Sequence, residues 1–281
     1  MTGVQTCALP IYADPVSTSK PILERIALNG RNALVTGGNK GIGRAIVHAY
    51  AQAGANVAIL GRNEDDNEKV RSEVENLYPN VRVTAYKCDV TDEDQINNAV
   101  KKVVMEFGSL EIACNNAGIA EWVKAEEMTY QQWLKMISNN LDSAFLCASA
   151  QAKYMLKQQY GKIIFTSSVS AKIANYPQPQ AHYNAAKAGV NSLTRCLATE
   201  WADRGVRVNT LSPGFTMTPL LEELMVTPIG QEYYSKWISR IPLKKMGEVT
   251  DMQGAAVFLA SEASDFMTGA DLAIDGGYLS W

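Results

Sequence analysis

The chain has 281 residues, of which 47% are hydrophobic, and a formal net charge of −3 at pH 7. These values are typical of a soluble globular protein with one large core, so we expect a single domain. Without runs of Lys or Arg there is no electrostatic reason to expect nucleic acid or an anionic membrane as a partner, and a small molecule is the expected ligand. No apolar stretch approaches the roughly 20 residues needed to span a bilayer.

The five cysteines contain no C-x-x-C pair, and only two histidines are present. We therefore expect neither a disulfide framework nor a metal site, and interpret the cysteines as small buried hydrophobes in a reducing, cytoplasmic environment. The segment Met1–Tyr12 lacks periodicity and the basic start of a signal peptide, so we interpret it as a cloning or sequencing scar. We predict an N-terminal extension over residues 1–27, disordered or partly artefactual, and one domain over residues 28–281.

Short β-branched runs alternate with amphipathic segments from about Asn32 onward. The runs predict seven strands, at residues 33–36, 57–60, 81–84, 110–113, 162–165, 206–209 and 272–275. The segments between them, such as 43–54 and 91–107, carry apolar residues at helical spacing and end near glycine. This alternation predicts a doubly wound, Rossmann-type α/β fold, with a seven-stranded parallel sheet and helices on both faces.

The ligand of such a sheet binds outside the carboxyl ends of its strands. The longest stretch without a clear element, Pro213–Glu248, is predicted to be irregular and to form a substrate loop at about 214–248.

A glycine-rich turn follows the first predicted strand, with the sequence Thr36-Gly-Gly-Asn-Lys-Gly-Ile-Gly43. Glycine lets the backbone turn tightly and approach a pyrophosphate, whose charge then meets the free N–H groups at the start of the next helix. The spacing T-G-x-x-x-G-x-G differs from the common G-x-G-x-x-G. A tight strand-to-helix turn without a ligand is the alternative.

The second predicted strand ends at Gly61 and is followed by Arg62, where an NAD-binding protein would carry an acid for the ribose 2′-hydroxyl. Arg62 can hold a 2′-phosphate by a bidentate pair, and Lys40 can add a second cation. These residues favour NADP(H). The alternative is a pair of solvated surface cations, since the acidic run at 64–66 would oppose a phosphate.

Tyr183 and Lys187 are spaced i, i+4, which places both side chains on one face of a helix. A phenol with a pKa of about 10 is a poor base at neutral pH, but positive charge from Lys187 and an oxidised nicotinamide is expected to lower that pKa. Tyr183 could then act as a general acid and base. A serine beside the tyrosine would polarise the carbonyl, and because adjacent strand residues point to opposite faces, only one of Ser167 and Ser168 can face the cofactor.

Taken together, several motifs resemble the compact form of the short-chain dehydrogenase/reductase family, from about Leu28 to the C-terminus. They are the glycine turn, Cys88-Asp89-Val90, Asn115-Asn-Ala-Gly118, Asn140-Leu141, Ser168, Tyr183, Lys187 and Ser212-Pro213-Gly214. The resemblance implies that Tyr183 is the catalytic acid/base, that Ser168 orients the carbonyl, and that Lys187 and Asn140 restore the proton through a water. It implies no metal and the following cofactor-binding residues: Gly37, Asn39, Lys40, Gly41, Ile42, Gly43, Arg62, Asn63, Asp89, Val90, Asn116, Ala117, Gly118, Tyr183, Lys187, Pro213, Gly214, Thr216 and Thr218.

The same resemblance implies individual roles at the cofactor. Asp89 would bind the adenine amino group, residues 116–118 would line the adenine ribose, and Thr218 with the backbone near Thr216 would bind the carboxamide. Structural alternatives are a helix cap for Asp89, a loop turn for Thr218, and a bond to a neighbouring carbonyl within a helix for Asn140.

The gap from Ser168 to Tyr183 is two residues longer than is usual in the family, and the excess lies in the X-Pro loop Ala174–Gln180. This loop is expected to shape the pocket wall. Together with Thr268–Tyr278 it resembles the branch that interconverts polyols and ketoses, such as mannitol, arabinitol, xylulose and sorbose. Four polar side chains could match substrate hydroxyls or could simply be solvated: Asn175, Gln178, Gln180 and the pocket-edge residue His182.

We therefore expect an NADP(H)-dependent oxidoreductase that exchanges hydride with a ketone or secondary alcohol, in a ketose/polyol pair. Alternatives are a reductase of a 3-ketoacyl thioester or other hydrophobic ketone, because fold and acid–base residues do not specify the substrate, and an NADP-sensing regulator without catalysis. A monomer would expose Phe266, Leu279 and Trp281, so with the family resemblance we expect a homotetramer.

Overall fold

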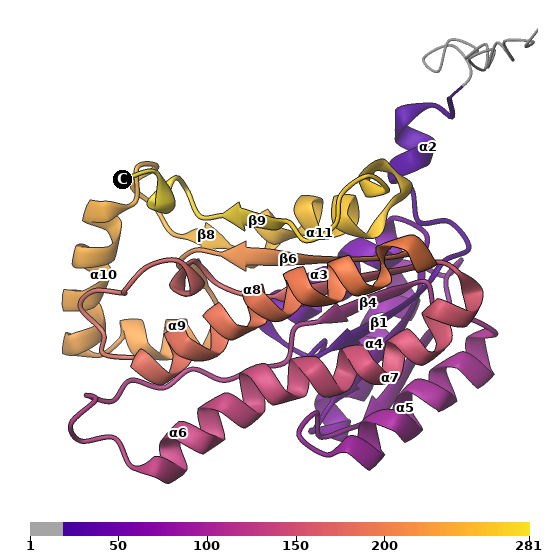
Figure 1. The fold of residues 1–281 in the computed structure, drawn as a ribbon. Helices are drawn as coiled ribbons and strands as arrows, with labels where there is room; N and C mark the ends of the chain where they lie inside the picture. The colour runs from indigo at the N-terminus through magenta and orange to yellow at the C-terminus, as the bar shows by residue number, and fades with distance from the viewer. Residues whose placement is uncertain (1–18) are drawn as a thin grey trace, which may run out of the picture.

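The computed structural model describes residues 19–281 of the chain (Figure 1). Residues 1–18, which include Cys7 and the segment interpreted as a scar, lie outside the described residues. Within the predicted extension, helix α2 (Ile22–Ile26) has a defined place, so the prediction of disorder does not hold there. It is held beside η5 (Glu262–Ser264) because Lys20 Nζ lies 2.9 Å from the Glu262 carboxylate.

A parallel sheet of seven strands forms the centre of the molecule, in the order β3-β2-β1-β4-β5-β6-β9. Its strands are β1 (Asn32–Thr36), β2 (Asn56–Gly61), β3 (Val83–Lys87), β4 (Ile112–Asn115), β5 (Gly161–Thr166), β6 (Val206–Pro213) and β9 (Asp271–Ile274). Every neighbouring pair is parallel, which confirms the predicted doubly wound fold. β3 begins later than predicted because the N–H of Val81 closes a turn onto Tyr78 O at 3.2 Å.

Helices cover both faces of the sheet (Figure 1). The α-helices besides α2 are α3 (Gly41–Gln52), α4 (Glu64–Leu77), α5 (Glu93–Phe107), α6 (Tyr130–Ile137), α7 (Ser143–Gln158), α8 (Ala181–Trp201), α9 (Pro219–Met225), α10 (Pro228–Arg240) and α11 (Gln253–Ala260). Short turns are the π-helical η1 (Ser138–Asp142) and the 3₁₀ segments η2 (Val169–Ala171), η3 (Ala202–Arg204), η4 (Val249–Met252), η5 and η6 (Tyr278–Ser280).

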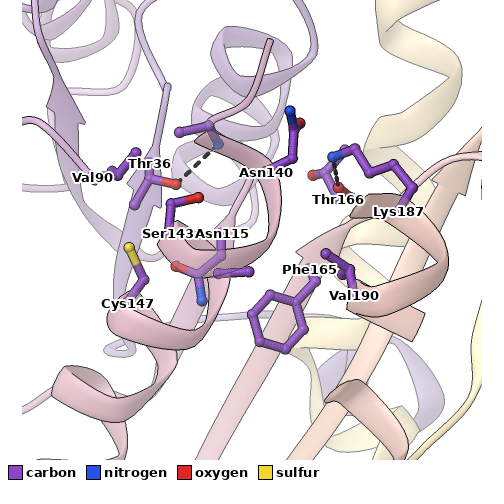
Figure 2. A pocket seen from close by; sticks show the side chains of 12 residues that line it. Thr36, Val90, Asn115, Asn140, Ser143, Cys147, Phe165, Thr166, Lys187 and Val190 are labelled. Atoms are coloured by element: carbon purple, nitrogen blue, oxygen red, sulfur yellow. Dashed lines mark hydrogen bonds between the residues drawn. The ribbon is translucent and has the colours of Figure 1, made fainter. Parts of the chain in front are cut away.

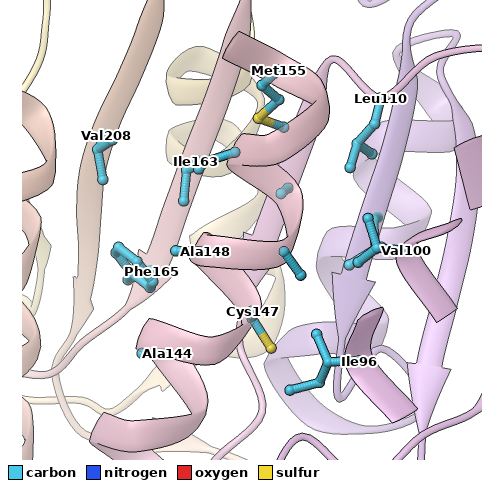
Figure 3. Packing of buried hydrophobic residues seen from close by; sticks show 14 of the residues in the cluster. Ile96, Val100, Leu110, Ala144, Cys147, Ala148, Met155, Ile163, Phe165 and Val208 are labelled. Atoms are coloured by element: carbon cyan, nitrogen blue, oxygen red, sulfur yellow. The ribbon is translucent and has the colours of Figure 1, made fainter. Parts of the chain in front are cut away.

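Two hydrophobic clusters lie on opposite faces of the sheet. Successive strand residues alternate between them, so Leu34 belongs to the cluster formed with α5, α7 and α8, and Val35 to the cluster formed with α3 and α11. Figure 3 shows the first cluster, where Ala148 and Met155 of α7 pack against Ile163 of β5. Helices therefore cover both faces of the sheet, and the loops that follow the strands lie at its carboxyl edge.

The stretch predicted to be irregular, Pro213–Glu248, is in fact largely ordered, so that prediction was wrong. It contains α9, α10 and a small parallel sheet of β7 (Thr216–Met217) and β8 (Gly247–Glu248). Both helices begin with proline directly after a threonine, and Thr227 caps α10 by accepting from Gly230 N at 3.1 Å. Proline is favourable at the first position of a helix, and the repeated Thr-Pro pairs were the available signal.

Among the helices of residues 19–281, none has both the length and the apolar character required to cross a membrane. The same residues contain no group of three or more His, Cys, Asp or Glu side chains placed to hold a metal ion. Cys88, Cys114 and Cys147 are buried free thiols, as predicted. Cys196 is exposed instead, because it lies on the outer side of α8, whereas Thr194 and Leu197 face the core.

Candidate active site

The turns after β1 and β4 are joined at the carboxyl edge of the sheet. The hydroxyl of Thr36, at the end of β1, accepts from Ala117 N at 3.1 Å (Figure 2). It also accepts from Asn116 N at 3.0 Å. In the other direction, the side-chain amide nitrogen of Asn116 donates at 3.3 Å to the carbonyl oxygens of Thr36 and Gly37. Two segments predicted to bind the cofactor thus lie side by side.

The glycine turn has a backbone that side chains would disrupt. Gly37 and Gly41 have φ angles of 63° and 53°, in the left-handed region. A Cβ atom on Gly43 would lie 2.1 Å from Gly37 O. Among the described residues no side chain caps the start of α3, so the N–H groups of its first turn stay available to an anion. This cradle fits a pyrophosphate, and Ile42 anchors it by packing on the core under α3.

The end of β2 has no space for an acidic side chain. A Cβ atom on Gly61 would lie 2.4 Å from Asn67 Oδ1 and 2.8 Å from the amide nitrogen of Asn39. Arg62 and Lys40 are exposed, and neither forms an ion pair with any residue of the described part of the chain. This arrangement fits a 2′-phosphate.

The acidic run at 64–66 occupies the first turn of α4, where negative charge stabilises the helix. Three other predicted cofactor residues have structural tasks. Asn63 caps α4 by accepting from Asp66 N at 3.2 Å, and Asp89 Oδ1 accepts from Thr91 N at 2.9 Å in a turn. Val90 is buried in the core. Their cofactor roles stay predictions beside these contacts.

Tyr183 and Lys187 lie one turn apart at the start of α8. The Lys187 ammonium is 5.6 Å from the centre of the Tyr183 ring and donates to Thr166 O at 2.9 Å (Figure 2). The Ser168 hydroxyl lies close enough to the Tyr183 phenol to lower its pKa, and it donates to Ser170 Oγ at 3.0 Å. Ser167 points elsewhere and donates to Lys187 O at 3.4 Å. The structure therefore groups Ser168, rather than Ser167, with the tyrosine and the lysine.

Burial dominates the titration of this group. It raises the pKa of Tyr183 above its usual value, and the nearby Ser168 hydroxyl offsets only part of that rise. Burial also lowers the pKa of Lys187 to about 8. The lowering of the Tyr183 pKa that was predicted from Lys187 together with an oxidised nicotinamide is thus not seen in the protein alone, where burial dominates.

Asn140 lies in η1, and its Oδ1 and Lys187 Nζ lie 2.5 Å and 3.6 Å from the position that a Cβ on Gly118 would occupy. The Asn140 amide nitrogen donates to Ile119 O at 3.0 Å and to Met136 O at 3.1 Å, so the structural alternative is also realised. Its buried Oδ1 has no hydrogen-bond partner among the described residues. A cavity of about 10 Å³ is lined by Asn140, Thr166 and Lys187 (Figure 2). That is room for about one water, which fits the predicted proton relay.

The segment after β6 passes over the glycine turn. A Cβ atom on Gly214 would lie 2.7 Å from Asp275 Cα, so this backbone is packed tightly against the chain that follows β9. Thr216 donates to Gly214 O at 3.1 Å, next to Pro213 at the end of β6. Thr218 Cγ2 is 3.7 Å from the position that a Cβ on Gly41 would occupy. Of the predicted carboxamide residues, Thr218 thus lies beside the cofactor turn.

The polar residues of the X-Pro loop are not simply solvated, so that alternative was wrong for Gln178 and Gln180, while a role in matching substrate hydroxyls stays a prediction. Gln178 and Gln180 are buried and bonded to protein atoms. Gln180 donates to Ser170 Oγ at 3.2 Å and to Asn175 Oδ1 at 3.0 Å. His182 is fully buried rather than at a pocket edge. The partners of Gln178 and Gln180 include residues outside the loop, and both ring nitrogens of His182 lack a hydrogen-bond partner among the described residues, which residue type alone does not reveal.

Sequence reasoning missed a group of packed rings that we call the aromatic wall: Trp122, Phe215, Tyr233, Trp237 and Tyr278. Phe215 stacks on Trp237 with ring centres 4.7 Å apart and meets Tyr278 edge-on at 5.3 Å. Trp122 lies 5.3 Å from Tyr233 and 5.8 Å from Trp237. The available signal was the density of aromatic residues between 215 and 237.

Known proteins resemble this chain over nearly its whole length. The family model described as enoyl-(acyl carrier protein) reductase matches residues 37–279. A probable NADP-dependent mannitol dehydrogenase from Yarrowia lipolytica is 39% identical over 96% of this chain and 95% of its own length. A sorbose reductase from Candida albicans is 38% identical over 94% of both chains.

Solved structures agree in fold. The NADPH-dependent 3-quinuclidinone reductase of Rhodotorula rubra superposes with a TM-score of 0.85 at 33% identity, covering 99% of this chain and 100% of that chain. A gluconate 5-dehydrogenase from Burkholderia cenocepacia, in complex with NADP and tartrate, superposes with a TM-score of 0.86 at 32% identity, covering 93% of this chain and 100% of that chain.

Proposed function

Because the chain belongs to the short-chain dehydrogenase/reductase family, an oxidoreductase family acting on CH–OH and C=O groups, we propose that it is an NADP(H)-dependent enzyme that interconverts a ketose and a polyol. The observation that carries the proposal is the grouping of Ser168, Tyr183 and Lys187 at the carboxyl end of β5. Relatives named as mannitol dehydrogenase and sorbose reductase support the substrate class.

The side chains divide the acid–base work of ketone reduction. When bound, NADPH supplies the hydride. Tyr183, kept protonated by its raised pKa, donates its proton to the carbonyl oxygen, and Ser168 holds that oxygen by a hydrogen bond. Lys187 is mainly protonated at pH 7, and a water between it and Asn140 Oδ1 would return a proton to the phenol.

The backbone cradle and two cations would hold the cofactor. The pyrophosphate would lie at the start of α3, with the 2′-phosphate between Arg62 and Lys40. Replacing Arg62 by Ala should lower kcat/KM with NADPH roughly 10- to 100-fold and leave kcat/KM with NADH unchanged, because a charge-assisted pair is lost only with the phosphate. Lys69→Ala, an exposed α4 control, should change neither. A wild-type preference for NADH would contradict the assignment.

The substrate class is tested by a panel of ketoses and polyols with NADPH and NADP⁺, together with a bulky apolar ketone and a 3-ketoacyl thioester. We expect the highest kcat/KM for a ketose or polyol. The apolar ketone as best substrate would instead favour a reductase of hydrophobic ketones, for which the aromatic wall provides a rationale.

We further propose a homotetramer in the cytoplasm. Phe266 and Trp281 are exposed by 106% and 84%, as expected for side chains that a partner subunit would cover, whereas Leu279 packs on the cluster around Ile241 and is not such a residue. The unpaired cysteines of the described chain are compatible with a reducing compartment. Size-exclusion chromatography with light scattering tests the assembly, and a monomer would contradict it.

A further inference from the structure

Helix α10 lies directly on the segments that carry the proposed chemistry, beyond the carboxyl end of β6 (Figure 1). Its residue Ile238 and the adjoining Ile241 pack with Val169, which follows Ser168 in the chain. Its Trp237 stacks on Phe215, which separates Gly214 from Thr216. A displacement of α10 would therefore reach both the serine and the predicted carboxamide site.

The X-Pro loop holds α10 through side chains. Gln178 is only 4% exposed, and its Oε1 accepts from the indole nitrogen of Trp237 at 2.9 Å. Next to it, the Tyr176 ring lies under the Arg240 guanidinium at 4.5 Å. On the other side of the loop, Pro179 O accepts from Val123 N at 2.9 Å, which connects the loop to the aromatic wall at Trp122.

The pair of Gln178 and Trp237 specifies one orientation of the helix. The indole N–H is a donor only, and Trp237 is fully buried, so it needs an acceptor at one place. Apolar packing alone would tolerate several rotations of α10 about its axis. This hydrogen bond has a single acceptor, so it is kept in only one of those rotations. The partly exposed rings of Trp122 and Tyr233 pack on Trp237 and take their positions from it.

We propose that Gln178 is a positioning residue that determines chain-length specificity, by fixing α10 and the aromatic wall against the far end of a six-carbon sugar substrate. The inference rests on the proposed function for the identity of the substrate. On this proposal a six-carbon chain that reacts at Ser168 and Tyr183 would extend towards the wall, whereas a three-carbon ketone would end before it. Gln178 touches neither the cofactor nor the reacting carbonyl in this arrangement, and acts through Trp237.

The test compares kcat/KM for fructose with kcat/KM for dihydroxyacetone, both with NADPH. Gln178→Leu and Trp237→Phe each remove the hydrogen bond and should lower the fructose-to-dihydroxyacetone ratio roughly tenfold. The double variant should fall no further, because both changes remove the same contact. Gln178→Glu keeps an oxygen acceptor and should restore the ratio. Gln231→Leu makes the same chemical change on the exposed face of α10 and should leave the ratio unchanged.

An unchanged ratio in Gln178→Leu, or an equal loss with both ketones, overturns the proposal. If Gln178→Leu does not fold, Trp237→Phe, which keeps a stacked ring, decides in the same way. Amide hydrogen exchange over residues 228–240 is read independently of turnover and should be roughly tenfold faster in Gln178→Leu than in Gln231→Leu. If the wild type reduces no ketose, the proposed function fails, and the exchange rates alone decide whether Gln178 holds α10. Equal exchange rates in Gln178→Leu and Gln231→Leu would then contradict that role as well.

Discussion

The catalytic group and the aromatic wall are held in different ways. Lys187 is fixed by a strand carbonyl, Thr166 O, and its own carbonyl is bonded by Ser167. The wall is held by side chains that meet side chains, as in the pair of Gln178 and Trp237. Chemistry that rests on the sheet can stay constant while a wall built from replaceable side chains adapts to another substrate.

The strongest test of this division is Tyr183→Phe, which removes one hydroxyl and leaves the ring. Turnover should fall about 10²- to 10⁴-fold because the proton donor is lost, while the Kd for NADPH stays within about twofold. Steady-state kinetics and a fluorescence titration give the two values. Tyr234→Phe, on the exposed side of α10, is the matched control and should retain activity. Full turnover by Tyr183→Phe would refute the catalytic assignment.

A second test asks how closely the cofactor cradle depends on its backbone. Gly43→Ala would place a methyl group 2.1 Å from Gly37 O, so the turn must shift and the Kd for NADPH should rise at least roughly tenfold. Gly254→Ala is the control, since a Cβ there meets nothing within 4 Å and the helix should gain about 1 kcal/mol. Equal affinities in the two variants, measured by calorimetry, would argue against the cradle.

The smallest effect concerns the buried ammonium of Lys187, whose pKa falls to about 8 in the folded protein. Above pH 8 the unfolded chain binds more protons than the native state, so this group makes the protein more stable as the pH rises towards about 10.4. Between pH 7 and 9.5 the free energy of unfolding of the wild type should gain about 2 kcal/mol relative to Lys187→Met.

Urea denaturation at both pH values measures this difference. The exposed Lys157→Met should follow the wild type, which separates burial from loss of charge in general. Parallel stability curves for the wild type and Lys187→Met would contradict a desolvated lysine.

The features that were predictable from the sequence have local signals. The strands of the sheet follow β-branched runs, and Tyr183 and Lys187 follow from helical spacing. The family resemblance favoured Ser168 over Ser167, and in the structure, where both serines follow the end of β5, Ser168 is the one beside the phenol.

The features that were not predictable depend on distant partners. Gln178 and Trp237 are 59 positions apart, so nothing local to the loop indicates their contact. The direction of the Tyr183 pKa is set by burial, which only the packed fold determines. Cys196 is exposed because its position on α8 faces away from the core, although cysteine as a residue type favours the core.

The π-helical turn Ser138–Asp142 makes the site sensitive to residue count. It joins α6 to α7 without a break and carries Asn140 on a wide turn. Deleting one residue there would either close the wide turn to an ordinary α-turn or rotate α7 by about 100°, the angle of one residue in an α-helix. Either Asn140 would swing away from Lys187 or Ala148 and Met155 would leave the core. In the turn Ser138–Asp142, insertions and deletions should therefore harm the site more than substitutions do.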